Sequence, residues 1–225
     1  MQSFAEISAQ ACDRHGGSEA FEASLPNPSA IEELRTIPDH RWLAGFTRVI
    51  FQAGISWKVI DAKWQGFEDA FHQFDIGQNA MMSDEDLERL VSDTRIVRHM
   101  PKIQSVRANA IMLQEFAQQH GSPAAMFADW PPTDWIGLLA FLKAKGSRLG
   151  GNSAAYALHY MGLNGFIFGR DGVAALIRAG VVDKIPKSAR DLAKVQMALN
   201  TWMEESGRPL SHISKILASS IDTSP

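Results

Sequence analysis

Residues 142–171 read LKAKGSRLGGNSAAYALHYMGLNGFIFGRD, and this stretch decides the predicted fold. The pattern predicts a helix that ends at Lys145-Gly146, a glycine-rich turn, a second helix from about Asn152 to Met161, and a loop that carries Asp171. Such a turn leaves backbone N–H groups at the start of the second helix free to bind an anion. The stretch therefore predicts a phosphate-binding helical hairpin over residues 142–162, with an ordinary αα-hairpin as the alternative.

Several residues of the hairpin are candidates for contacts with phosphate. They combine positive side chains with backbone amides of the turn, and they are Lys145, Gly146, Arg148, Gly150, Gly151 and Asn152. A further basic candidate, Lys102, lies between a basic connector and a predicted long helix that ends near His120. Its alternative is a place on a solvated face.

The remainder of the chain also predicts helices. Trp42, Phe46, Val49 and Ile50 recur at the spacing of one helix face, and no stretch shows sustained strand-like alternation. The fold class is therefore all-α, with about ten helices in two joined lobes. Prolines are frequent up to residue 38, so we expect residues 1–38 to form an N-terminal arm that packs on a helical domain of residues 39–225.

Composition limits the classes of function. The chain has 225 residues, is 45% hydrophobic and carries a net charge of −3, so contact with nucleic acid requires a local basic patch. Cys12 is its single cysteine, which excludes a disulfide framework and fits a cytoplasmic location. The N-terminus does not read as a signal peptide, and no apolar run is long enough to span a membrane.

Four stretches together resemble the DNA-3-methyladenine glycosylase I family. They are QAGISW at residues 52–57, FHQFD at 71–75, DEDLERL at 84–90 and the hairpin. That family belongs to the helix-hairpin-helix DNA glycosylases. The resemblance implies their fold and a base-excision repair enzyme, a hydrolase that cleaves the N-glycosidic bond of an alkylated purine such as 3-methyladenine. Its partner would be double-stranded DNA with a damaged base, which must be flipped out of the duplex before cleavage.

The resemblance also assigns roles in a base pocket. Trp57 takes the position of the tryptophan that stacks on the damaged base, and Ile55 takes that of the wedge inserted into the duplex. Phe51 and Gln52 would help to hold the base, and Trp42 would fill part of the same space. The alternative for Trp57 is a core tryptophan.

Two departures from the family stand out. Val49 lies where the family has its pocket glutamate, three residues before Gln52. The zinc ligands are missing, since Cys12 is alone and Ile167 takes the place of a ligand histidine. We therefore expect no zinc and no other transition metal, while the wider superfamily leaves open a monovalent cation on the hairpin carbonyls.

Asp171 is the predicted catalytic residue. It follows Gly151 by twenty residues, the distance at which the wider superfamily, unlike the nearest family, carries a catalytic aspartate. A carboxylate near the sugar stabilises the oxocarbenium-like transition state of glycosidic cleavage. The alternative is that Asp171 caps the following helix.

Three functions remain open on the sequence. The leading one is a monomeric DNA glycosylase. The second is a non-catalytic helix-hairpin-helix DNA-binding protein that has lost the pocket, for which Val49 is the best indication. The third is a helical scaffold without a DNA role.

Overall fold

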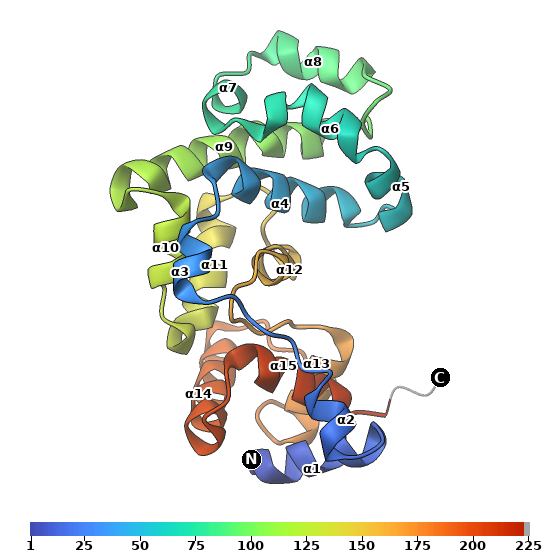
Figure 1. The fold of residues 1–225 in the computed structure, drawn as a ribbon, viewed down its shortest axis with the longest axis vertical. Coiled ribbons are helices and arrows are strands. Elements are labelled where there is room, and N and C mark those ends of the chain that lie inside the picture. The colour runs from blue at the N-terminus through green and yellow to red at the C-terminus, as the bar shows by residue number, and fades with distance from the viewer. Residues whose placement is uncertain (223–225) are drawn as a thin grey trace. The chain divides into compact units, whose positions relative to one another are not determined.

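A computed structural model describes residues 1–222, and over this range the chain is all-α, with fifteen α-helices, two 3₁₀ helices and no strand (Figure 1). The all-α prediction is confirmed. Two compact units form from segments distant in sequence. Unit 1 contains residues 1–29, 131–138 and the described residues from 164 onward, and unit 2 contains residues 30–130 and 139–163.

Unit 2 holds most of the helices. They are α3 (Ile31–Arg35), α4 (Asp39–Gln52), α5 (Trp57–Ala62), α6 (Trp64–Ala70), η1 (His72–Phe74), α7 (Ile76–Ala80), α8 (Asp84–Ser92), α9 (Met100–His120), α10 (Pro123–Asp129) and α12 (Ser153–Tyr160). The predicted apolar face of α4 is buried, as Trp42, Phe46 and Ile50 show. Through this face α4 packs on α9, α10 and α12, and the rings of Trp42 and Phe127 lie 4.5 Å apart.

Unit 1 joins both ends of the described chain. Its helices are α1 (Phe4–Arg14), α2 (Ser18–Glu22), η2 (Pro132–Asp134), α13 (Arg170–Arg178), α14 (Ala189–Ser206) and α15 (Leu210–Ser219), and α11 (Trp135–Lys145) begins in it. The buried Trp135 donates its Nε1–H to the carbonyl of Phe166 at 2.8 Å, and Trp202 donates to the carbonyl of Gln2 at 3.2 Å. Arg208 holds Glu22 through two hydrogen bonds of 2.8 and 2.6 Å.

The number of helices differs from the predicted ten because short helices escape a search for periodicity. α7 has five residues and α10 has seven. Each begins at a capping side chain: Asp75 accepts a hydrogen bond from the Gln78 N–H at 2.8 Å, and Ser122 accepts one from the Ala125 N–H at 2.9 Å. The unit boundary also lies inside the predicted arm, because residues 1–29 pack in unit 1 while residues 30–38 belong to unit 2.

Candidate functional site

A tight turn after α4 carries the QAGISW motif. The helix ends at Gln52, the Ile55 N–H donates to the Gln52 carbonyl at 3.3 Å, and α5 begins at Trp57. Gly54 has φ +80°, a left-handed conformation that glycine adopts without strain. The turn leaves the Trp57 side chain 54% exposed, so the alternative of a core tryptophan is wrong.

A groove of about 210 Å³ lies beside Trp57, entirely within unit 2. It is lined by Val49, Gln52, Ala53, Trp57, Asn152, Ser153, Tyr156 and Tyr160. The C-terminal end of α4 and its turn form one wall, and the first two turns of α12 with the residue before them form the other. None of these side chains is charged at neutral pH, so the groove offers aromatic faces, amides and hydroxyls.

Tyr156 and Tyr160 were not predicted as site residues. They are the only two tyrosines of the sequence, and their spacing of four residues places them on one face of α12. Their rings stack at 6.2 Å, and Tyr160, 52% exposed, meets Trp57 edge to face at 6.4 Å. Burial, followed by the neighbouring Tyr156, raises the pKa of Tyr160, which therefore keeps its proton and its capacity to donate a hydrogen bond.

Of the five residues predicted for the base pocket, three line the groove and two do not. Val49, Gln52 and Trp57 line the groove. Phe51 instead lies fully buried, since it projects from the opposite side of α4 to Val49 and packs on Phe67 at 4.7 Å. Trp42 lies two helical turns before the groove and packs in the core.

Ile55, the predicted wedge, is half-buried in the turn between α4 and α5. It does not line the groove, and a wedge that enters DNA need not do so. Its insertion into a duplex stays a prediction.

The predicted hairpin is formed by α11 and α12. Its turn places Arg148 at φ +61° and Gly151 at φ +59° and buries Leu149. A Cβ on Gly146 would lie 2.9 Å from the carbonyl oxygen of Leu142, a backbone atom that cannot easily move, so the turn favours glycine there. Lys145 and Arg148 are exposed, as a phosphate contact requires, and α12 begins directly after Gly150, Gly151 and Asn152.

Lys102 does not fit a phosphate contact. It is 3% exposed, and its ammonium donates to the carbonyls of Phe51 at 3.1 Å and Ala53 at 2.6 Å. Burial, followed by repulsion from Arg148, lowers the pKa of Lys102. A positive group at the C-terminal end of α4 satisfies carbonyls that have no partner within the helix. The alternative of a solvated face is also wrong.

Asp171 belongs to unit 1 and lies in the first turn of α13, not in a loop. Gly169 is the N-cap residue of that helix, so Asp171 does not hold the cap position. The half-buried Asp171 lines a cavity of about 600 Å³ with Arg14, His15 and Lys215. The catalytic role of Asp171 stays a prediction.

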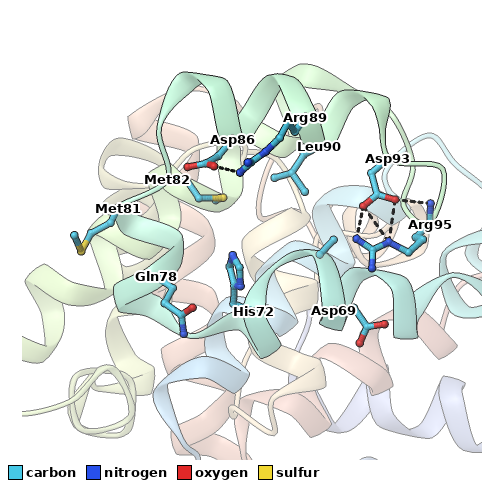
Figure 2. Close-up of a pocket in the computed structure, with 11 residues that line it drawn as sticks. Asp69, His72, Gln78, Met81, Met82, Asp86, Arg89, Leu90, Asp93 and Arg95 are labelled. Carbon is cyan, nitrogen blue, oxygen red and sulfur yellow. Dashed lines mark hydrogen bonds and ion pairs between the residues drawn. The ribbon is translucent and has the colours of Figure 1, made fainter.

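A third cavity, of about 640 Å³, lies near α6 and α8 within unit 2 (Figure 2). Its arginines are already paired, because Arg95 binds Asp93 and Arg89 binds Asp86. The Arg95 guanidinium lowers the pKa of Asp93 and holds its carboxylate ionised. Pairing inside the cavity leaves no unbalanced positive charge to attract phosphate.

Comparison with known proteins identifies the fold first. A 3-methyladenine DNA glycosylase I from Staphylococcus aureus aligns with 68% of this chain and 91% of its own, at a TM-score of 0.51 and 19% sequence identity. The chain therefore has the all-helical fold of this DNA glycosylase, as the sequence predicted.

Sequence comparison gives partial matches to one family. Residues 40–133 match the family model described as methyladenine glycosylase. The DNA-3-methyladenine glycosylase 1 of Escherichia coli is 42% identical over 76 residues, which are 34% of this chain and 40% of that protein. The DNA-3-methyladenine glycosylase of Haemophilus influenzae is 34% identical over 59 residues, which are 26% of this chain and 32% of that protein. The matched segments thus span less than half of either relative, and the family match ends before the hairpin.

Two further features bear on cofactors and membranes. Among residues 1–222, no three histidine, cysteine, aspartate or glutamate side chains gather as metal ligands would, and Cys12 forms no disulfide. The expected absence of zinc stays a prediction. In the same part of the chain, no helix combines the length and apolar character that crossing a membrane requires.

Proposed function

We propose that this protein is a base-excision repair DNA glycosylase that hydrolyses the N-glycosidic bond of an alkylated purine, such as 3-methyladenine, after base flipping. One observation carries the proposal: α12 borders both the hairpin turn and the groove. Its N-terminus begins at the hairpin turn, and its next two turns present Tyr156 and Tyr160 to the groove opposite Trp57. A phosphate held at the start of α12 would therefore lie close to a base stacked in the groove.

The hairpin would anchor double-stranded DNA. The amides of Gly150, Gly151 and Asn152 supply donors at the positive end of α12, and the exposed Lys145 and Arg148 supply charge. Each neutralised phosphate releases counterions, so binding weakens steeply as salt rises. This mode of binding suits a chain of net charge −3, because its attraction to DNA is local.

The groove would receive the flipped base. Trp57 offers an exposed face for stacking, while Gln52 and the two tyrosines offer polar groups to the base edge. Ile55 would support the duplex that the base has left.

The chemistry assigned to Asp171 is electrostatic. As the C1′–N bond breaks, its electron pair leaves with the base, and water adds to C1′ with loss of a proton. A carboxylate beside the sugar stabilises the positive charge that develops on it and orients the water. An alkylated, cationic purine is already a good leaving group, so a strong general acid is not required. The proposal uses no zinc, and a monovalent cation on the hairpin carbonyls remains compatible with it.

A single-turnover assay tests the proposal. Duplexes bearing 3-methyladenine, 7-methylguanine, 1,N6-ethenoadenine, hypoxanthine or uracil are mixed with excess protein, and released base is measured. Release of an alkylated purine, abolished in Asp171→Asn with folding retained, supports the assignment. Retained activity in that variant would remove Asp171 from the mechanism.

A non-catalytic DNA-binding protein is the second candidate, and Val49 favours it. This side chain lines the groove where the family has a glutamate, and it cannot hydrogen-bond a base. Salt-dependent binding of duplex without release of any of the five bases would establish this candidate. A monomeric state and a cytoplasmic location accompany both candidates as predictions.

A further inference from the structure

Two buried polar side chains of α9 reach out to separate turns of unit 2. Lys102 and Asn109 are 3% and 1% exposed, and their spacing of seven residues places them on one face of the helix. At 1.5 Å per residue they lie roughly 10 Å apart along the axis. Neither side chain is among those that line the groove.

Lys102 holds the turn that carries Trp57. Its ammonium binds the carbonyls of Phe51 and Ala53, which flank Gln52 at the end of α4. The ammonium also lies 5.8 Å from the centre of the Phe51 ring. These contacts fix the last turn of α4 and the point at which the chain leaves it toward Ile55 and Trp57.

Asn109 holds the hairpin turn. Its side-chain amide donates to the carbonyl of Ser147 at 3.1 Å and accepts from the N–H of the same residue at 2.7 Å. The pair replaces hydrogen bonds that the Ser147 backbone would make in a regular helix. Gly146 is also seated on α9, because a Cβ there would lie 3.1 Å from the sulfur of Met112.

We propose that α9 is a spacer and that Lys102 and Asn109 are positioning residues that set the separation between the Trp57 turn and the hairpin. The separation matters because, under the function proposed above, one nucleotide must place its base in the groove while nearby phosphates rest on the hairpin. A displacement of about 1 Å between groups that bind parts of one substrate can cost on the order of a hundredfold in rate.

The choice of residue types supports positioning over simple stabilisation. Burying a lysine and an asparagine carries a desolvation cost, and apolar side chains of similar size often serve stability equally well. Both side chains make their hydrogen bonds to backbone groups at turns. Directional hydrogen bonds fix the backbone conformation of a turn more closely than apolar packing does.

Three variants test the proposal. Lys102→Met and Asn109→Leu keep the approximate size of each side chain and remove its hydrogen bonds. Ser105→Ala is the matched control, because Ser105 is buried on the same helix and its hydroxyl donates only to the carbonyl of Lys102. Lys102→Arg tests rescue by another cation.

The measurements are amide hydrogen exchange in residues 52–57 and 146–152, affinity for undamaged duplex, single-turnover base release and urea unfolding. We expect Lys102→Met to speed exchange in residues 52–57 and to slow base release at least about tenfold, with duplex affinity within about threefold. We expect Asn109→Leu to speed exchange in residues 146–152 and to weaken duplex binding. Lys102→Arg should recover part of the exchange protection in residues 52–57 and part of the rate of base release. Ser105→Ala should leave hydrogen exchange unchanged in both turns.

Exchange that stays unchanged in both turns would overturn the proposal. So would losses of activity that track the unfolding free energy and recur to the same extent in Ser105→Ala. If the wild-type protein releases no base, the proposed function fails, but hydrogen exchange still decides whether the two side chains fix the two turns.

Discussion

Replacing Trp57 with alanine separates a stacking residue from a structural one. The side chain is 54% exposed, and among the described aromatic contacts its ring meets only Tyr160, edge to face. Such a contact contributes about 0.5–1.5 kcal/mol beyond burial. Because so much of the ring is already in solvent, we expect the free energy of unfolding to fall by less than about 2 kcal/mol.

The effect on activity should be larger. Stacking of a base on an aromatic side chain contributes about 1–3 kcal/mol, and each 1.4 kcal/mol corresponds to a factor of ten. We therefore expect Trp57→Ala to slow single-turnover release of an alkylated purine by roughly tenfold to a hundredfold. Affinity for undamaged duplex should change little, because no base occupies the groove in that complex.

Met81→Ala is the matched control. Met81 is 84% exposed and lines the cavity of Figure 2, away from the residues of the groove, so its loss should change neither property. Base release by Trp57→Ala within about twofold of wild type would refute the assignment of Trp57. A loss of more than about 3 kcal/mol in unfolding free energy would show that the residue belongs to the core after all.

Three further outcomes follow from particular side chains. Gly165→Ala should lower the free energy of unfolding by about 1–3 kcal/mol, because the added Cβ would lie 2.2 Å from the Trp135 ring. Gly169→Ala is the control, because a Cβ there meets open space. Urea unfolding compares the two variants. Burial lowers the pKa of His159 below its ordinary value of 6.5, so the unfolded chain takes up this proton more readily than the folded chain. The free energy of unfolding should therefore be greatest above pH 6.5 and fall as the pH drops below it. His159→Gln should flatten this pH dependence. Arg148→Ala should weaken duplex binding and reduce the slope of log K against log salt by about one, and an unchanged slope would remove this phosphate contact.

The fold was predictable where helices are long and periodic. The buried face of α4 follows directly from the spacing of its apolar residues. The short α7 and α10 were not predicted, because a cap and one or two turns give no period to detect. Two joined lobes were predicted, but the segments that form each compact unit were not, since residues 1–29 pack with segments more than 100 residues away.

The site was predictable only in part, and the misses have physical causes. The exposed Trp57 and the hairpin follow from local motifs, because residues adjacent in the sequence determine a tight turn. Phe51 was misplaced because a motif gives sequence neighbours and not the side of the helix on which each one projects. Tyr156 and Tyr160 had one available sign, the pairing of the only two tyrosines four residues apart beside the hairpin, but their partner Trp57 lies about 100 residues earlier.

Val49 has a consequence for selectivity. A carboxylate facing a cationic base at about 4 Å would attract it by roughly 4 kcal/mol at an effective dielectric of 20, and the groove has no such group. Its aromatic faces offer a cation only about 0.5–2 kcal/mol, which corresponds to less than about thirtyfold discrimination. Discrimination between lesions would then depend mainly on how readily each nucleotide leaves the duplex and how labile its glycosidic bond is.

We therefore expect a broad range of alkylated purines, released at relative rates that follow their spontaneous depurination. Single-turnover rates for 3-methyladenine and 7-methylguanine, each divided by its uncatalysed rate, should agree within about tenfold. Val49→Glu should widen the difference between cationic and neutral lesions, because it adds a carboxylate to a groove that lacks charge. A wild-type preference for one lesion far above tenfold, after this correction, would mean that neutral groups such as Gln52 and Tyr160 read the base edge directly.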